Sequence, residues 1–180
     1  MQLKYSLDEN DYLQYQLYAA SKSKNIKAQR NRTFMMMIAT FLIISYMIFS
    51  TADMMFDPLI IFFALLLILY KWYEKKRYSN HYRKNIAENY KERFGLISTL
   101  TFTENQIIDE NKLGESKINY ESLTEINEIQ DYYFLKLITG QSLIIPKKVI
   151  PNQSDFTLKL EEIKNRFNLE NNVELDWKWK

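Results

Sequence analysis

The sequence predicts a membrane α+β protein, in which a two-helix transmembrane hairpin precedes a β-rich domain that closes with one helix. Three observations predict this fold class. Two uncharged, strongly apolar stretches stand close together in the first half of the 180-residue chain, and Lys and Arg gather on the outer flanks of the pair. The second half changes to short alternating stretches separated by turn residues, which is typical of a strand meander.

The first region, residues 1–32, predicts a short strand followed by an amphipathic helix. Residues 2–5 alternate between polar and apolar, as an edge strand does. Asp8 and Asp11 stand where a helix would begin, because their carboxylates can accept hydrogen bonds from free backbone N–H groups. The end of this helix is basic and continues into the first apolar stretch.

The predicted hairpin covers residues 33–73. Residues 33–50 carry no charge and would extend over about 27 Å as a helix, close to a hydrocarbon core of about 30 Å. Residues 58–73 form a shorter second span that needs Lys71 to snorkel, so a re-entrant hairpin stays open as an alternative. Two buried helices of a globular protein are disfavoured, because the rest of the chain offers too little sequence to cover them on all sides.

Basic residues flank the hairpin on both sides, whereas the loop 51–57 contains no Lys or Arg. This asymmetry predicts a multi-pass protein of the plasma or inner membrane with both termini in the cytoplasm. An anionic lipid surface would attract each nearby cation by about 1 kcal/mol, although these charges could also serve only to set the topology. The candidate lipid-surface contacts are Lys22, Lys24, Lys27, Arg30, Arg32, Lys75, Lys76 and Arg77.

Residues 74–95 predict a basic juxtamembrane helix that ends at Gly95. Its lone His81 has no second His or Cys nearby and is interpreted as a surface residue. One side of the helix is an apolar stripe at a spacing of four, which predicts a docking face for the following domain or a self-association seam. The stripe consists of Tyr78, Tyr82, Ile86, Tyr90 and Phe94.

Residues 96–170 predict a small β domain. About six short strands with close turns lie between residues 98 and 146, including one slip in the alternation between 123 and 129. A strand meander capped by one amphipathic helix is the layout of a pleckstrin-homology-like (PH-like) domain. The side chains of the closing helix, 154–167, that we expect to pack on the sheet are Phe156, Leu158, Leu160, Ile163 and Phe167.

The tail, residues 171–180, alternates strictly over its last eight positions. It could add an edge strand to the sheet, place its tryptophans in a lipid interface, or pair with the sheet edge of a partner. These alternatives stay open. The candidate docking residues are Lys147, Lys148, Trp177 and Trp179.

Composition excludes several kinds of site. The chain has no Cys, which rules out disulfides, thiolate metal sites and Cys nucleophiles, and its three Gly cannot form a Gly-rich phosphate loop. Residues 95–180 carry ten basic and fourteen acidic side chains, a balance that argues against nucleic-acid binding. The carboxylates considered as acid–base groups, Asp109, Glu110, Glu125 and Glu128, are scattered, so we expect no enzyme, no metal and no cofactor.

The chain resembles the YcxB-like family of bacterial membrane proteins in its layout and in three segments. These segments run over residues 118–128, 131–135 and 144–148, and begin with Ile118, Asp131 and Ile144. Relatives often carry an aromatic residue shortly after the third segment, where this chain has Val149 and Ile150. The resemblance implies a two-span hairpin with a C-terminal PH-like domain, and no established activity, catalytic residue or cofactor.

Together these features predict a non-enzymatic integral membrane protein that presents a cytoplasmic PH-like domain as a docking or regulatory module. A lipid-surface-binding protein or an accessory subunit of a membrane complex is the alternative. A membrane enzyme or transporter component is less favoured, because neither span holds a charge in its middle. The expected partners are membrane lipids and either a second protein or another copy of the chain, with no nucleic acid.

Overall fold

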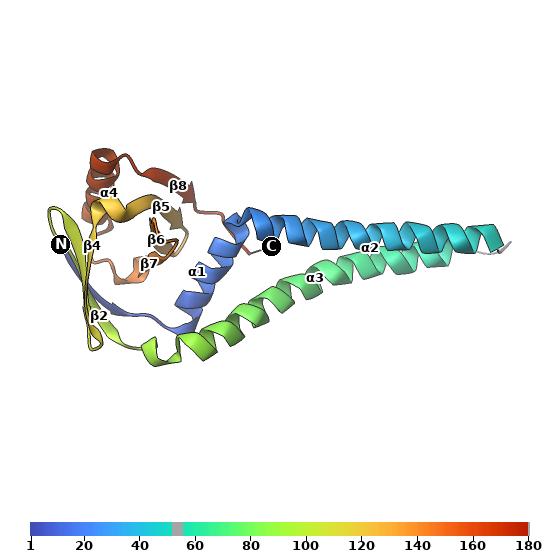
Figure 1. The fold of residues 1–180 in the computed structure, drawn as a ribbon, viewed down its shortest axis with the longest axis horizontal. Coiled ribbons are helices and arrows are strands. Elements are labelled where there is room, and N and C mark those ends of the chain that lie inside the picture. The colour runs from blue at the N-terminus through green and yellow to red at the C-terminus, as the bar shows by residue number, and fades with distance from the viewer. Residues whose placement is uncertain (52–55, 180) are drawn as a thin grey trace. The chain divides into compact units, whose positions relative to one another are not determined.

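The structure, a computed structural model, describes residues 1–51 and 56–179, with side chains described except at 48–51, 56–60 and 64. The chain divides into two units. Residues 1–15 and 85–178 form the two-sheet unit, and residues 16–84 with Trp179 form the helical unit. Each unit is described by itself, and Figure 1 shows the elements of both.

The two-sheet unit contains two four-stranded sheets, ordered β1-β2-β3-β4 and β7-β6-β5-β8. The first sheet is antiparallel, and in the second only β8 runs parallel to its neighbour, β5. The strands are β1 (Gln2–Ser6), β2 (Ile97–Phe102), β3 (Gln106–Asn111), β4 (Gly114–Asn119), β5 (Leu123–Ile129), β6 (Tyr132–Leu137), β7 (Ser142–Pro146) and β8 (Glu170–Glu174).

The strands predicted between residues 98 and 146 are confirmed as β2 to β7, and the predicted N-terminal strand is β1 at the edge of the first sheet. The slip predicted in the alternation of β5 is a register shift between Leu123 and Glu125. Short 3₁₀ turns precede β2, connect β4 to β5 and follow β7. They are η1 (Lys91–Arg93), η2 (Tyr120–Ser122) and η3 (Lys147–Val149).

Helix α4 (Gln153–Phe167) packs against the sheets through one face. Asn152 caps its N-terminus by accepting hydrogen bonds from the backbone N–H groups of Ser154 and Asp155, and Asn168 ends it in the left-handed conformation. The Phe156 ring is fully buried between Phe102 and Tyr133, with centroids 5.6 and 5.3 Å away. The prediction that Leu158 joins this face is wrong, because it lies two positions beyond Phe156 and is 64% exposed.

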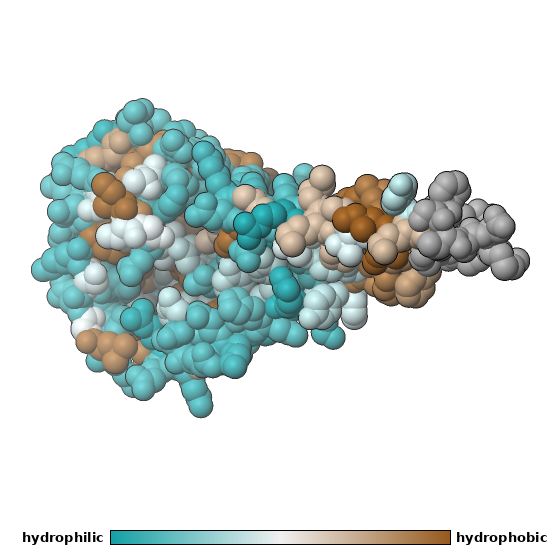
Figure 2. Space-filling view, turned by 45° about the vertical axis from the view of Figure 1, so that its right-hand side comes forward, coloured by the Kyte–Doolittle hydropathy of each residue, from teal (hydrophilic) through white to brown (hydrophobic). Residues whose placement is uncertain are grey.

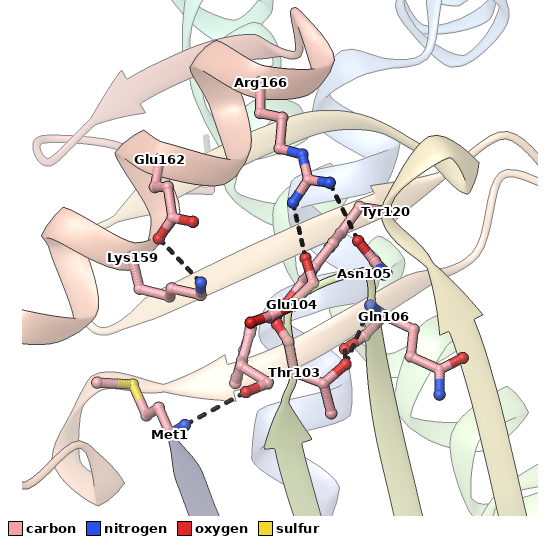
Figure 3. Close-up of polar contacts among 10 residues, drawn as sticks. Met1, Thr103, Glu104, Asn105, Gln106, Tyr120, Lys159, Glu162 and Arg166 are labelled. Atoms are coloured by element: carbon pink, nitrogen blue, oxygen red, sulfur yellow. Dashed lines mark hydrogen bonds and ion pairs between the residues drawn. The ribbon is translucent and has the colours of Figure 1, made fainter.

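The C-terminal turn of α4 is tied to the turn between β2 and β3 (Figure 3). The Arg166 guanidinium donates to the carbonyl of Glu104 at 2.9 Å and to the side-chain oxygen of Asn105 at 3.0 Å. Glu104 and Asn105 form the turn that the sequence predicts at this point. The helix is therefore fixed to the first sheet at its end as well as along its buried face.

Helix α1 (Glu9–Lys22) begins as predicted at the pair of aspartates. The backbone N–H of Asp8 donates to the Asp11 carboxylate at 2.8 Å, and the N–H of Asp11 donates to the Asp8 carboxylate at 2.9 Å. This reciprocal arrangement satisfies two backbone donors at the start of the helix. Asp11 is also 1% exposed and accepts a hydrogen bond from the Tyr132 hydroxyl of β6 at 2.8 Å, so it fastens the helix start to the second sheet.

The long helices are α2 (Lys24–Thr51) and α3 (Phe56–Asn89), which lie side by side in Figure 1. The basic helix predicted separately at 74–95 is the continuation of α3. Two residues of its stripe pack on helix α1, a contact that neither prediction for the stripe named: the Tyr90 and Phe94 rings lie 5.1 and 5.8 Å from that of Tyr12. Gly95 follows with a φ of 70°.

Among the residues that the structure describes, no helix has a stretch both long and apolar enough to cross a membrane. The predicted fold class, a membrane α+β fold with a transmembrane hairpin ahead of a PH-like domain, is therefore wrong. The described chain is an α+β fold with two sheets. The helices are long, but α2 opens with a basic segment from Lys24 to Arg32 and α3 is charged from Lys71 onward. The predicted acidic loop falls largely on residues 52–55, outside the described residues.

Candidate functional site

The helical unit is held together by a seam of side chains that face each other across α2 and α3. The Phe41 and Phe63 rings lie 4.4 Å apart, and the Lys71 ammonium lies 4.6 Å from the Phe34 ring. The Arg30 guanidinium pairs with the Glu74 carboxylate at 3.1 Å. In each of these pairs the two residue numbers add up to nearly the same value, so the helices run antiparallel in a constant register.

The outward faces of the two helices are covered with apolar side chains. Figure 2 shows this surface on one face of the pair. We call it the apolar band, and Ile68 at 69% exposure is typical of its members. Single exposed apolar residues are ordinary, but a continuous patch of this kind marks an interaction surface. The apolar band comprises Met35, Met36, Leu42, Ile43, Ile44, Tyr46 and Met47 of α2, and Ile61, Phe62, Leu65, Leu66, Ile68 and Leu69 of α3.

One end of the apolar band is bordered by exposed cations, which we call the basic collar. The register places the segment before the band in α2 level with the segment after it in α3, because Arg30 lies opposite Glu74. Trp72 and Tyr73 are also exposed here, at 65% and 56%. The basic collar comprises Lys22, Lys24, Lys27 and Arg32 of α1 and α2, and Lys71, Lys75, Lys76 and Arg77 of α3.

Arg30 is the one candidate lipid contact that the structure places inside the seam rather than on the outer surface. Its partner Glu74 is 2% exposed, so the pair is withdrawn from water. The guanidinium also lies 5.1 Å from the Trp179 ring and 5.6 Å from the Tyr78 ring. The other seven predicted lipid contacts are exposed members of the basic collar.

Trp179 is buried in the helical unit, an arrangement that was not among the three alternatives left open by the sequence. It is 8% exposed, its ring lies 5.8 Å from that of Tyr78, and its indole N–H donates to the Lys75 carbonyl at 3.4 Å. Trp177 is half-buried after a turn in which its N–H donates to the Glu174 carbonyl. The edge strand, β8, ends at Glu174, before both tryptophans.

The predicted docking lysines of the two-sheet unit are not alike. Lys147 is largely buried, pairs with Glu128 at 2.6 Å and lies 4.9 Å from the Tyr133 ring. Lys148 is 66% exposed, with its ammonium 3.8 Å from the Asp11 carboxylate. The structure therefore gives Lys147 a role within the fold and leaves Lys148 on the surface.

The four carboxylates considered as acid–base groups occupy separate positions. Asp109 accepts a hydrogen bond from the Ser98 hydroxyl at 2.6 Å, and Glu110 is exposed on the same strand. Glu125 and Glu128 belong to the second sheet, where they form ion pairs with Lys136 and Lys147. Within the described ranges, no group of three or more metal-ligating side chains could hold a metal ion.

The buried tyrosines of the two-sheet unit have raised pKa values. Burial raises the pKa of Tyr120 to about 12, and its hydroxyl donates to the Thr103 carbonyl at 2.9 Å. Burial, followed by the hydrogen bond to Asp11, raises the pKa of Tyr132 well above its usual value. Both hydroxyls therefore stay protonated at neutral pH and act as hydrogen-bond donors that hold the fold.

Comparison with known proteins gives one match. The family model described as YcxB-like protein matches residues 102–159, which run from the end of β2 through β7 into α4. No curated protein and no solved structure matches the chain. The match contains all three segments on which the sequence resemblance depends, and so confirms it. This segment of the chain, residues 102–159, is therefore similar to the YcxB-like family.

Proposed function

We propose that this protein is a non-enzymatic lipid-surface protein. The apolar band of α2 and α3 rests in the lipid of the cell membrane from the cytoplasmic side, and the two-sheet unit serves there as a docking or regulatory module. The single observation that carries this proposal is the exposed apolar band of the helical unit. Moving an exposed apolar side chain from water into lipid stabilises the bound state by about 1.5–3 kcal/mol.

Two further features support the proposal. Trp72 and Tyr73 are exposed among the cations of the basic collar, close to the end of the apolar band, and such amphipathic rings favour the boundary between lipid and water. The carboxylates of the two-sheet unit support a non-enzymatic role, because Asp109, Glu125 and Glu128 are already engaged in hydrogen bonds or ion pairs. An accessory subunit of a membrane complex would use the same surfaces, with a protein partner on the two-sheet unit.

The test is flotation of the full chain with phospholipid vesicles after detergent removal. The variant Leu42→Ser, Leu65→Ser, Ile68→Ser removes three exposed members of the apolar band. We expect it to lower the partition into vesicles by about a thousandfold, since each side chain contributes at least about 1.5 kcal/mol.

The matched control places the same substitutions on exposed apolar residues of the two-sheet unit. It is Leu113→Ser, Ile138→Ser, Leu158→Ser, whose side chains are 70%, 76% and 64% exposed. We expect the control to float like the unchanged chain. A folded, unchanged chain that stays at the bottom of the gradient would contradict the proposal, as would an equal loss in both variants.

A further inference from the structure

The helical unit has a strongly one-sided charge. Residues 16–84 contain eleven Lys and Arg, and apart from the 51–57 loop their only acidic residue is Glu74. Glu74 is buried and paired with Arg30 at 3.1 Å, so its charge is compensated inside the seam. Outside that loop, the helical unit therefore carries a large excess of positive charge.

The register concentrates these cations at one end of the apolar band. Because α2 and α3 are antiparallel, the basic segment before the band and the basic segment after it meet at the same level. A single flat surface can therefore contact both segments at once. Cations spread evenly along the helices could not do this. Gathering them at one end also gives the collar a higher positive electrostatic potential than an even spread would.

Aromatic rings position some of these cations at the boundary of the apolar band. The Lys76 ammonium lies 5.3 Å from the Trp72 ring, and the Lys71 ammonium lies 4.6 Å from the Phe34 ring. Each ammonium lies against an aromatic ring, so these two cations are held beside apolar side chains. An anionic group just outside an apolar layer matches this order of apolar, aromatic and cationic side chains.

We propose that the basic collar selects anionic phospholipid headgroups, an inference that rests on the proposed lipid-surface function. The collar binds the phosphate and acidic groups of the headgroups while the apolar band contacts the acyl chains. A nucleic acid would satisfy the cations and leave the adjoining apolar band exposed to water, so the lipid is the partner that fits both surfaces.

The test compares vesicles of phosphatidylcholine alone with vesicles containing about a third phosphatidylglycerol, at low and high salt. The variant Lys75→Gln, Lys76→Gln, Arg77→Gln removes three exposed collar cations. We expect about a hundredfold weaker binding to the anionic vesicles and little change on neutral ones. The control variant is Lys4→Gln, Lys112→Gln, Lys117→Gln, which removes three exposed cations of the two-sheet unit and should bind like the unchanged chain.

The outcomes separate this inference from the function on which it rests. Binding that prefers anionic vesicles, weakens in high salt and is lost in the collar variant alone supports the inference. Equal binding to both vesicles without salt dependence overturns it and leaves the proposed function standing. Binding to neither vesicle overturns both. Displacement from anionic vesicles by short duplex DNA at equal phosphate concentration would assign the collar to polyanions in general and would also overturn the inference.

Discussion

Replacing Tyr132 with Phe tests how the first helix is fastened to the second sheet. The substitution removes one hydroxyl, which donates to the Asp11 carboxylate at 2.8 Å, and keeps the ring stacked on Phe134 with centroids 5.8 Å apart. Asp11 is 1% exposed, so water cannot easily replace the lost donor. The remaining donors near this carboxylate are the backbone N–H of Asp8 at 2.8 Å and the Lys148 ammonium at 3.8 Å.

The expected loss of stability follows from these contacts. A hydrogen bond to a charged group contributes about 1.5–3 kcal/mol, and its loss leaves a buried carboxylate with one donor fewer. We expect Tyr132→Phe to lower the free energy of unfolding of the two-sheet unit by about 2 kcal/mol. The assay is hydrogen exchange of the full chain, followed by mass spectrometry on peptides from β6 and from the start of α1. The slowest amides should exchange about thirtyfold faster.

The control is Tyr15→Phe, which removes an exposed hydroxyl whose distance to the Gly140 carbonyl is 3.4 Å. Because this weak, solvated contact contributes little, we expect a change of less than about threefold. If Tyr132→Phe changed exchange by no more than the control does, the buried hydrogen bond would not be what fastens the helix.

Three other predictions concern the core of the two-sheet unit, its stability at alkaline pH and the C-terminal tail. Phe156→Ala should destabilise the two-sheet unit by about 3–5 kcal/mol in urea unfolding, whereas Leu158→Ala, on the exposed face of α4, should stay within about 0.5 kcal/mol; equal effects would contradict the assigned face. The raised pKa of Tyr120, about 12, means that its contribution to stability is complete below pH 10 and is lost as the pH rises toward 12. The free energy of unfolding should therefore fall less between pH 8 and pH 11 for Tyr120→Phe than for the unchanged chain. An equal fall in both would refute the raised pKa of Tyr120. Arg30→Ala should speed the release of Trp179 by carboxypeptidase several-fold, because the guanidinium lies against the buried indole, and unchanged release would show that this contact does not hold the tail.

The sequence predicts local elements well where periodicity and turn residues act together. The strands between residues 98 and 146 follow directly from their alternation, and the helix start at Asp8 and Asp11 follows from the capping chemistry of carboxylates. The error at Leu158 has a simple cause. The residue is apolar, and only the 100° turn per residue of a helix shows that it points away from the Phe156 face.

Contacts between distant segments could not be predicted in the same way. The burial of Trp179 and the pairing of Arg30 with Glu74 depend on the register of α2 against α3, which no local pattern determines. Lys147 was predicted as a docking residue because it adjoins Lys148, yet the pairing of β6 with both β5 and β7 brings it against Glu128. The parallel pairing of β8 with β5 is likewise a long-range feature.

The prediction of transmembrane spans failed for a different reason. It counted uncharged residues in two stretches of the sequence, whereas among the described residues no stretch of α2 or α3 is both long and apolar enough to cross a membrane. The same composition supports the proposed surface role, because an exposed apolar band beside an exposed basic collar suits the boundary between lipid and water.

Site-directed spin labelling tests the central claim most directly, because the chain has no Cys and single labels carry no background. One label would replace Ile68 in the apolar band, and a second, separate variant would carry it at Leu158 on the exposed face of α4. On addition of phospholipid vesicles, the label at position 68 should become more accessible to dissolved oxygen and less accessible to a water-soluble nickel chelate. The label at position 158 should remain accessible to the chelate. A label at position 68 whose chelate accessibility is unchanged by vesicles would contradict lipid contact by the apolar band.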